Sequence, residues 1–578
     1  MQYTGARILM EALIEQGVDT VFGYPGGAVL PLYDELYRYR DRIRHILVSH
    51  EQHAAHAADG YARATGKAGV CLATSGPGAT NLVTGIATAY MDSVPLVAIT
   101  GNVSRHLLGK DSFQEVDIAG ITMPVVKHNW IVNEAHTLGE IVREAFTVAQ
   151  SGRPGPVLID LPRDITTRQG VWIPAARVGE TGGSENRAVQ VMSERAHRLI
   201  ERNGRETFSA GDLDQAAAML LNAERPVIYA GGGVVASGAS GELRSLAERL
   251  NAPVALSLMG IGAFPPEHRL YTGLVGMHGT VASNQAAQRA DLIIALGVRF
   301  SDRVTSRTDC FAQGAAVLHL DIDSAEINKN VQADFFVLGD IKRLLTKLLE
   351  RLPPRPESGW NGEIARWKTQ TPRIEPSALH PRFVIEETAR RLGKEAIVAT
   401  DVGQHQMWTA QFYPFSRPRS FLTSGGLGTM GFGLAAALGA KLGRPDCPVA
   451  LFTGDGSFRM NCAELGTAKY YGIPILMVLI NNRALGMVRQ WQNFFYEKRY
   501  SETALDRPPD FVKLAEAYGI PAYRAETEAV FASMLDRALD GIASGSSVLI
   551  EALISVDELV LPMVPSGKPI DEQILGGR

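Results

Sequence analysis

The sequence has little cysteine, and its cysteines show no arrangement that would form a disulfide framework or a zinc site. Only four occur among 578 residues, and no two of them make a CxxC pair: Cys71, Cys310, Cys447 and Cys462. Scattered thiols of this kind are typical of reduced proteins in a cytoplasm.

Three further absences limit the kinds of protein that this sequence can encode. Lys and Arg number 57 against 61 Asp and Glu, so the formal net charge of −4 provides no basic excess for nucleic acid or an anionic membrane. The longest apolar run, residues 473–480, is far shorter than the ~20 residues that cross a bilayer. The first residues lead directly into an amphipathic helical pattern, without a signal or transit segment. These features predict a soluble cytoplasmic protein that binds neither nucleic acid nor membrane.

Short apolar runs that alternate with longer helical patterns are abundant. The runs are rich in β-branched residues and bounded by Gly, Asp or Pro, which is typical of strands buried on both faces of a parallel sheet. A buried helix segment explains any one run but not nine at this rhythm. The sequence therefore predicts an α/β fold. The runs are 45–50, 69–74, 94–100, 156–162, 226–233, 291–297, 316–323, 448–456 and 473–482.

The chain is too long for one hydrophobic core, because domains usually contain ~100–200 residues. Two stretches that are polar or rich in Pro and Gly interrupt the βα rhythm, as linkers do. We predict three doubly wound parallel-sheet domains, two linkers and a tail. The domains are 1–165, 210–352 and 377–565, the linkers are 166–209 and 353–376, and the tail is 566–578.

The segment Gly454-Asp455-Gly456-Ser457 carries the most chemical information. It ends one apolar run, and Asn482 ends the next. Carboxylate and amide oxygens suit Mg²⁺, and the carboxyl ends of parallel strands share the sheet edge where ligands bind. The glycines let backbone N–H groups approach a diphosphate near a helix start. A DG turn alone is common, but the combined pattern predicts a site for Mg²⁺ and a diphosphate.

This pattern resembles the thiamine-diphosphate motif of the pyruvate-oxidase-like superfamily. The resemblance implies that Mg²⁺ is bound by Asp455, Asn482 and the backbone carbonyl of Ala484. It also covers residues 402–405 and the Gly-rich loop 423–433, for which a close helix–strand crossing is the alternative explanation. The implied thiamine-diphosphate residues are Val402, Gly403, Gln404, His405, Gly428, Met430, Gly454, Asp455, Gly456, Ser457, Asn482, Leu485, Gly486 and Met487.

Glu51 is the candidate for the carboxyl group that activates the cofactor. In the superfamily such a group protonates a pyrimidine nitrogen, and a buried carboxyl is suited to this because burial raises its pKa. A capping box of Ser49 with Gln52, with Glu51 stabilised by the helix dipole, explains the same residues locally. The order of Glu51 before residues 73–81 favours the catalytic role, because it matches the superfamily's pyrimidine domain. Surface or packing roles are expected for the neighbouring His53 and His56.

Five further segments resemble the catalytic large subunits of the acetolactate synthase family. They are 109–115, 125–130, 151–165, 485–503 and 561–574. Position by position, this resemblance implies that Met487 and Trp491 line the substrate side of the site, and that Trp491 helps to select the second keto acid. Arg303 would face the incoming carboxylate, which suits a guanidinium group.

The same resemblance places three residues of the first domain at the site. Gln114 and Phe113 would approach from the partner subunit, and Lys127 would lie at the mouth. An aromatic core position for Phe113 or Trp491, and a solvated charge for Lys127, are the alternatives.

The central domain resembles the family's FAD site. The acid that ends the run 316–323 would bind a ribose hydroxyl, as in other nucleotide folds. The GGG of residues 231–233 is not a GxGxxG motif, and Ser301 stands where the family usually has Asp, which puts the local flavin contact in question. The implied FAD residues are Arg153, Gly231, Gly232, Gly233, Leu258, Met259, Met277, His278, Gly297, Arg299, Arg303, Asp321, Ile322, Gly339 and Asp340.

The resemblance implies a transferase that decarboxylates pyruvate on thiamine diphosphate. The hydroxyethyl group would pass to a second 2-keto acid, pyruvate or 2-ketobutyrate, in the first common step of branched-chain amino acid biosynthesis. FAD would be bound without net redox change. A homodimer would be the minimum active unit, with a homotetramer and a separate small regulatory subunit left open. The alternatives are an FAD-dependent pyruvate oxidase, another carboligase of the same family, and a non-catalytic binding protein.

Overall fold

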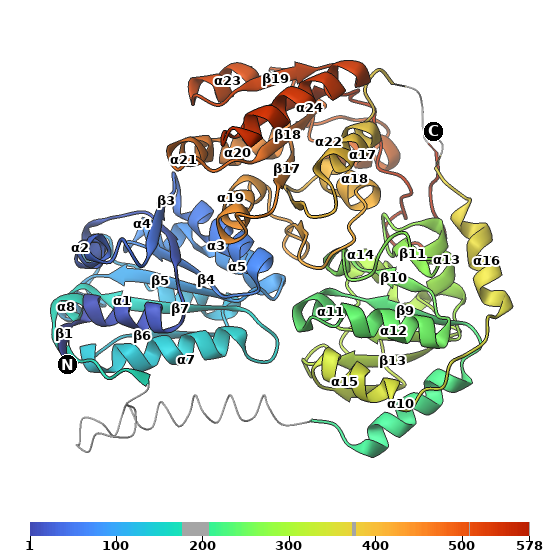
Figure 1. Ribbon diagram of the computed structural model, residues 1–578, viewed down its shortest axis with the longest axis horizontal. Helices are drawn as coiled ribbons and strands as arrows, with labels where there is room; N and C mark the ends of the chain where they lie inside the picture. Colours follow the sequence, from blue (N-terminus) through green and yellow to red (C-terminus); the bar gives the residue numbers. More distant parts are fainter. Residues whose placement is uncertain (176–206, 373–376, 508, 577–578) are drawn as a thin grey trace.

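The computed structural model describes residues 1–175, 207–372, 377–507 and 509–576. Three α/β domains are arranged as three lobes around a common centre (Figure 1). Each contains a six-stranded sheet in which every pairing is parallel, with helices on both faces. The predicted fold class is therefore confirmed. Each of the nine apolar runs overlaps a strand of one of these sheets.

The N-terminal domain has the strand order β3-β2-β4-β5-β7-β6. Its strands are β2 (Thr20–Gly23), β3 (Arg44–Leu47), β4 (Gly69–Ala73), β5 (Leu96–Asn102), β6 (His128–Ile131) and β7 (Pro156–Pro162). Its helices are α1 (Gly5–Glu15), α2 (Leu30–Arg38), α3 (Glu51–Thr65), α4 (Pro77–Asn81), α5 (Val83–Met91), α6 (Ile118–Thr122), α7 (Leu138–Gln150) and α8 (Arg163–Thr167).

The central domain has the strand order β11-β10-β9-β12-β13-β14. Its strands are β9 (Pro226–Ala230), β10 (Val254–Leu256), β11 (Tyr271–Leu274), β12 (Leu292–Leu296), β13 (Ala316–Asp321) and β14 (Phe335–Leu338). Its helices are α10 (Ala210–Asn222), α11 (Gly232–Ser237), α12 (Ser240–Leu250), α13 (Val281–Arg289), α14 (Asp302–Thr305) and α15 (Ile341–Leu349).

The C-terminal domain has the strand order β16-β15-β17-β18-β20-β19. Its strands are β15 (Ile397–Thr400), β16 (Phe421–Leu422), β17 (Val449–Gly454), β18 (Leu476–Asn481), β19 (Ala522–Ala525) and β20 (Val548–Leu553). Its helices are α17 (Pro381–Leu392), α18 (Gln404–Phe412), α19 (Gly433–Gly443), α20 (Asp455–Asn461), α21 (Leu465–Tyr470), α22 (Gly486–Phe495), α23 (Phe511–Ala517) and α24 (Glu528–Ala543).

Two expected linkers contain ordered structure. In the first, β8 (Gln169–Val171) pairs antiparallel with β1 (Gln2–Thr4) of the N-terminal domain. In the second, α16 (Gly359–Lys368) buries Trp360 in a core cluster of the central domain. Neither element was predicted, because β8 is only three residues long and α16 lies in a Pro-rich stretch. Residues 176–206 and 373–376 of these linkers lie outside the described residues.

The tail packs against the central domain. Ile570 is fully buried in the same core cluster as Trp360, and Met563 forms a β-bridge with Ile574. The Val564 backbone N–H donates to the Met277 carbonyl, and Gln573 Nε2 donates to the Gly279 carbonyl. The last described residues therefore support a segment of the central domain.

The N-terminal and C-terminal domains meet where α3 crosses α19 (Figure 1). A Cβ atom at Gly60 would lie 2.1 Å from the Ala436 carbonyl oxygen, and one at Gly439 would lie 1.8 Å from the Ala57 carbonyl oxygen. The two helix backbones are therefore in direct contact, and only glycine fits at these two positions.

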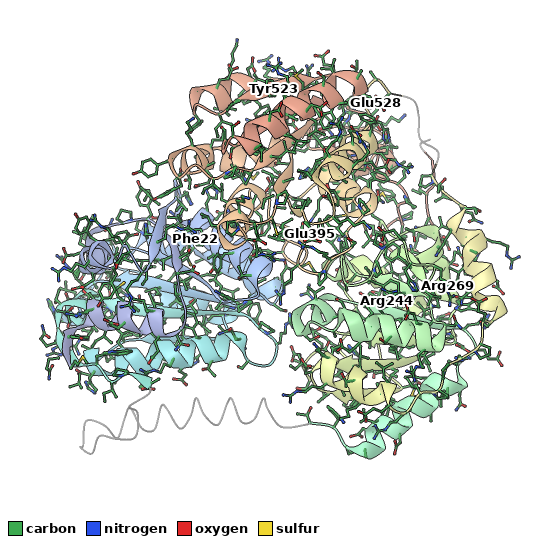
Figure 2. The ribbon with its side chains drawn as sticks, viewed as in Figure 1. Phe22, Arg244, Arg269, Glu395, Tyr523 and Glu528 are labelled. Atoms are coloured by element: carbon green, nitrogen blue, oxygen red, sulfur yellow. The ribbon has the colours of Figure 1, made fainter. Side chains whose placement is uncertain are left out.

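Side chains follow the usual division between interior and surface. Phe22 on β2 is completely buried, whereas Arg244 on α12 and Glu528 at the start of α24 are exposed (Figure 2). Among the described residues, no helix combines the length and the apolar character that crossing a membrane requires.

Candidate cofactor and substrate site

A cavity of about 1560 Å³ lies between the central and C-terminal domains. The carboxyl ends of strands from both sheets face it, which is where open α/β sheets bind ligands. From the C-terminal domain it is lined by the residues that follow β15, β17 and β18, and from the central domain by those that follow β9, β12 and β13. The turn 91–93 and the segment 150–154 of the N-terminal domain complete the wall.

All fourteen residues expected to bind thiamine diphosphate line this cavity, together with Ala484. Of the expected FAD residues, Gly231 and Gly339 do not line it. The two sets share one continuous space. Tyr229, Met91, Asp92 and Ser93 also line it, and the sequence patterns gave no signal for these four.

The candidate metal site lies where β17 and β18 end. Asp455 is buried, and its Oδ2 has no hydrogen-bond partner. Burial raises the pKa of this carboxyl to about 7. Nearby, Asn482 Oδ1 accepts from the Ala484 N–H at 3.1 Å, and Asn482 Nδ2 donates to Gln404 Oε1 at 2.9 Å. An orphaned carboxylate oxygen beside an oriented amide oxygen fits a hard divalent cation.

The expected metal ligands do not form a cluster of acidic, His or Cys side chains. No group of three or more His, Cys, Asp or Glu side chains suited to a metal occurs in the part of the chain that the structure describes. The predicted set contains one carboxylate, one amide and one backbone carbonyl. Such a site is found through the strand ends that carry it and not through a cluster of ionisable residues.

His405 supplies a second orphaned group in the same region. Its Nε2 is buried without a partner, and burial lowers the pKa of the ring to about 3, so the imidazole is neutral. A Cβ atom at Gly454 would lie 2.8 Å from His405 Nδ1. Glycine at this strand end therefore makes room for the ring, whose free nitrogen is available to a ligand such as a diphosphate oxygen.

The proposed substrate residues face one another across the cavity. Met487 and Trp491 are one turn apart on α22 of the C-terminal domain, and Arg303 is on α14 of the central domain. The Arg303 guanidinium carbon lies 5.8 Å from the centre of the Trp491 ring. A carboxylate bound by Arg303 would therefore lie beside an aromatic wall.

The expected flavin region begins at a tight backbone crossing. A Cβ atom at Gly231 would lie 2.4 Å from the Gly297 oxygen, and one at Gly233 would lie 2.6 Å from the Gly297 Cα. The glycines bring the ends of β9 and β12 together, which exposes backbone groups to the cavity. The Nε2 atom of His278 is buried without a partner, and desolvation of the ring lowers its pKa to about 4. These features fit a nucleotide cofactor, and Ser301 lies in the same wall.

Four expected site residues of the N-terminal domain do not line the cavity of this chain. Phe113 is 87% exposed, and Gln114, which has a φ of +58°, packs its backbone against Gly76. Glu51 is half-buried and accepts a hydrogen bond from Asn81 Nδ2 at 2.9 Å. The Lys127 ammonium donates to the Val148 and Ser151 carbonyls, and burial lowers its pKa to about 8. The Lys127 ammonium is thus held by backbone carbonyls, one of which belongs to Ser151, a residue that lines the cavity.

The start of α3 differs from the capping box that was the alternative explanation for this segment. His50 is the N-cap, and its Nδ1 accepts from the Gln52 N–H at 3.1 Å. The Ser49 hydroxyl instead donates to the Ala463 carbonyl, so the alternative capping box of Ser49 with Gln52 does not form. His53 and His56 are both buried, which agrees with packing roles.

Family models match all three domains. The thiamine pyrophosphate enzyme N-terminal TPP binding domain matches residues 3–121, the central domain matches 213–348, and the C-terminal TPP binding domain matches 401–552. Thiamine pyrophosphate is the same compound as thiamine diphosphate. The fold and these matches define a thiamine pyrophosphate enzyme.

Proteins of similar sequence show to which family of thiamine pyrophosphate enzymes the chain belongs. The chain is 47% identical to an acetolactate synthase large subunit of Mycobacterium tuberculosis, over 99% of this chain and 91% of that one. It is 46% identical to the large subunit of Corynebacterium glutamicum, over 98% and 89%, and 44% identical to the isozyme 3 large subunit of Escherichia coli, over 99% and 98%. The chain belongs to the acetolactate synthase large-subunit family.

Proposed function

We propose that the protein is the catalytic subunit of an acetolactate synthase, a transferase that uses thiamine diphosphate, Mg²⁺ and FAD. Pyruvate loses CO₂, and the remaining hydroxyethyl group passes to a second 2-keto acid. The product is 2-acetolactate with pyruvate as acceptor and 2-aceto-2-hydroxybutyrate with 2-ketobutyrate. The observation that carries the proposal is the single cavity in which Asp455 and Asn482 lie on the same wall as Trp491, with Arg303 opposite.

The proposed roles follow from the position of each group. Asp455, Asn482 and the Ala484 carbonyl would hold Mg²⁺, and His405 would contact the diphosphate. Bound thiamine diphosphate supplies a nucleophilic carbon and an electron sink for decarboxylation. Arg303 would orient the carboxylate of the acceptor, and the Trp491 ring would pack against its side chain.

A homodimer is the proposed minimum active unit. Glu51 and Gln114 do not line the cavity of their own chain, and Phe113 beside them is highly exposed. These facts support a site in which the N-terminal domain of one protomer completes the cavity of the other, with the Glu51 carboxyl holding a proton at the pyrimidine ring. A homotetramer is compatible with the same contact. A small regulatory subunit is proposed because the relatives are named large subunits.

We also propose a cytoplasmic location and limits for the N-terminal and central domains. All four cysteines are free, which supports a reducing cytoplasm. The N-terminal domain is proposed to end after β8, and α16 is proposed to belong to the central domain.

Product analysis tests the proposal. The protein is incubated anaerobically with pyruvate, thiamine diphosphate, Mg²⁺ and FAD, and acetolactate and CO₂ are quantified. One CO₂ for every acetolactate formed is expected, and Asp455→Ala is expected to abolish both. Acetate or acetyl phosphate that forms only with an electron acceptor would instead identify a pyruvate oxidase. Unchanged turnover in Glu51→Gln would contradict the role proposed for Glu51.

A further inference from the structure

The turn of residues 91–93, at the end of α5 in the N-terminal domain, contacts both of the other domains. From the central domain, Arg299 Nη1 donates to the Met91 carbonyl at 2.7 Å. From the C-terminal domain, the Gly425 and Gly426 N–H groups donate to the Asp92 carboxylate at 3.0 Å and 2.7 Å. The turn itself belongs to the N-terminal domain and lines the cavity.

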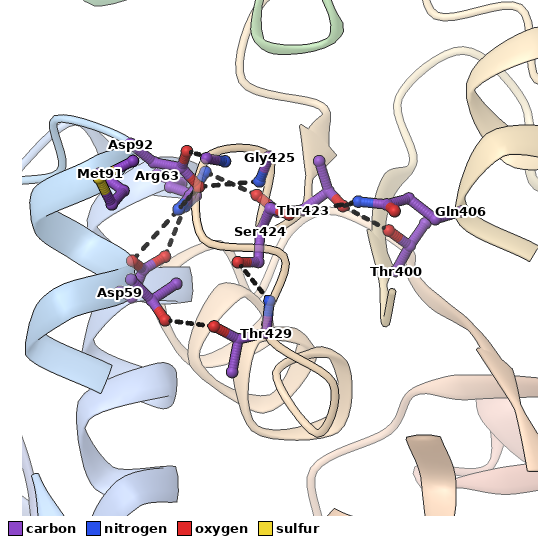
Figure 3. Close-up of polar contacts among 12 residues, drawn as sticks. Asp59, Arg63, Met91, Asp92, Thr400, Gln406, Thr423, Ser424, Gly425 and Thr429 are labelled. Atoms are coloured by element: carbon purple, nitrogen blue, oxygen red, sulfur yellow. Dashed lines mark hydrogen bonds and ion pairs between the residues drawn. The ribbon is translucent and has the colours of Figure 1, made fainter. Parts of the chain in front are cut away.

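The Asp92 carboxylate is fully buried and paired with Arg63 of α3 (Figure 3). Arg63 Nη2 donates to Asp92 Oδ2 at 2.9 Å, and Arg63 Nη1 donates to the Thr423 carbonyl at 2.9 Å. Asp59 also forms an ion pair with this guanidinium. Asp92 and Arg63 therefore attach the N-terminal domain to successive residues of the loop 423–426.

The attached loop continues into the expected thiamine-diphosphate residues Gly428 and Met430. The Thr429 N–H donates to Ser424 Oγ at 2.9 Å, which closes the loop on itself. A Cβ atom at Gly426 would lie 2.9 Å from Asp92 Oδ1, so the loop is packed tightly against the carboxylate. The position of this wall thus depends on Asp92 as well as on the C-terminal domain's own sheet.

The opposite side of the turn is held by two residues of the expected flavin wall. Besides Arg299, Arg153 Nε donates to Ser93 Oγ at 2.8 Å, and Arg153 also forms ion pairs with Asp323 and Glu326 of the central domain. A ligand that fixes Arg299 and Arg153 would fix the turn. A ligand that lies against Gly428 and Met430 would fix the loop, and the Asp92 carboxylate joins the two.

We propose that Asp92 is a positioning residue that couples flavin binding to thiamine-diphosphate binding within one chain. The coupling arises because each ligand orders a segment that the other also needs. Linkage is reciprocal, so each cofactor is expected to raise the affinity for the other by the same factor, typically ~5–150-fold. This inference rests on the cofactors of the proposed function and adds how their two sites communicate.

The test measures the affinity of the full-length apoprotein for thiamine diphosphate with Mg²⁺, without FAD and with saturating FAD. Titration calorimetry gives the two dissociation constants, and the reciprocal pair is measured from flavin fluorescence. In the wild type, FAD is expected to tighten thiamine-diphosphate binding at least ~5-fold. In Asp92→Asn the ratio of the two constants is expected to fall to about one.

Glu140→Gln is the matched control. Glu140 is a buried carboxylate paired with an arginine of the same domain, Arg143, and no hydrogen bond or ion pair of Glu140 to the loop or to the central domain is found among the described residues. This variant is expected to retain the wild-type ratio. A purely structural role for Asp92 would weaken both constants equally and leave the ratio unchanged, which would overturn the inference.

Ser93→Ala keeps the inference testable if Asp92→Asn does not fold. It removes only the hydroxyl that accepts from Arg153, and it is expected to reduce the ratio. Equal affinities with and without FAD in a wild type that binds both cofactors and forms acetolactate would overturn the coupling and leave the proposed function standing. Failure of the wild type to bind thiamine diphosphate would instead overturn the proposed function.

Discussion

The carboxylate of Glu464 lies 2.8 Å from Nδ1 of His53, across the contact between the C-terminal and N-terminal domains. The same oxygen accepts from the Ser49 N–H at 2.9 Å, and Glu464 is completely buried. Ser49 and His53 are two residues before and after Glu51. The C-terminal domain therefore fixes the backbone on both sides of the proposed catalytic carboxyl group.

Replacement of Glu464 by Ala is expected to slow activation of the cofactor. Small misplacement of a catalytic group costs up to about 100-fold in rate, so hydrogen–deuterium exchange at the reactive carbon of bound thiamine diphosphate should slow by about 10–100-fold. Quenched-flow NMR measures this exchange directly. Glu464→Gln, which retains an acceptor for the Ser49 N–H, should be intermediate. Wild-type exchange in Glu464→Ala, in an enzyme that Glu51→Gln inactivates, would show that Glu464 does not position Glu51.

Trp491→Leu is expected to change which 2-keto acid is used as acceptor. A smaller side chain removes packing against the acceptor, and packing differences of ~1–3 kcal/mol correspond to ~10–200-fold in specificity. The ratio of the two products, measured with pyruvate and 2-ketobutyrate in competition, should fall for 2-ketobutyrate by at least ~10-fold.

Phe494→Leu is the control for this change, because Phe494 is on the same helix, does not line the cavity and packs its ring against Phe495. It should leave the product ratio unaltered. A product ratio that shifts equally in both variants would point to disruption of α22 and not to a role in selection.

His56 makes the protein sensitive to acid. It lies on α3 and is fully buried, with its ring 5.3 Å from that of Phe432 at the start of α19. Burial lowers its pKa to about 3. Unfolded histidine has a pKa near 6.5, so the unfolded chain binds the extra proton between these values. Stability from His56 is therefore complete above about pH 6.5 and decreases as the pH falls, by up to ~1.4 kcal/mol per pH unit.

His56→Gln should lose less Tm than the wild type when the pH is lowered from about 7 to about 5. Thermal unfolding at both pH values measures this difference. His106→Gln, a change at an exposed histidine, should retain the wild-type dependence on pH. A wild-type loss of Tm in His56→Gln would contradict the assignment.

Gly439→Ala should destabilise the contact of α3 with α19. The new methyl group would overlap the Ala57 carbonyl, and overpacking of this kind costs about 1–3 kcal/mol or more. Gly362→Ala in the exposed part of α16 meets no atom within 4 Å and should instead be neutral or stabilising by up to ~1 kcal/mol. Thermal unfolding compares the two, and equal stability of the variants would contradict the close crossing.

The sequence predicted the buried centre of each sheet well and its margins less well. The β-branched runs became strands because strands buried on both faces need such residues. The strand β16 has only two residues and β8 only three, so neither carries a recognisable pattern. The sequence pattern therefore gave no sign of the later domain limit after β8 that we propose.

The candidate site was likewise predicted from the sequence only in part. Asp455 and Asn482 were predictable because consecutive motifs end adjacent strands, and the structure brings them together with Trp491 and Arg303 in one cavity. Asp92 and Glu464 were not predicted, since their contacts join residues hundreds of positions apart, such as Asp92 with Gly426. No local periodicity reports a contact of that kind.

The packing of residues 563–574 against Met277 and Gly279 has a practical consequence for anyone who handles this protein. Met277 lines the cavity, and the Val564 backbone supports it through a hydrogen bond at 2.8 Å. Loss of this segment would therefore take Ile570 out of a core cluster of the central domain and remove the hydrogen bond that supports Met277. Activity lost on storage is therefore best examined first by intact mass.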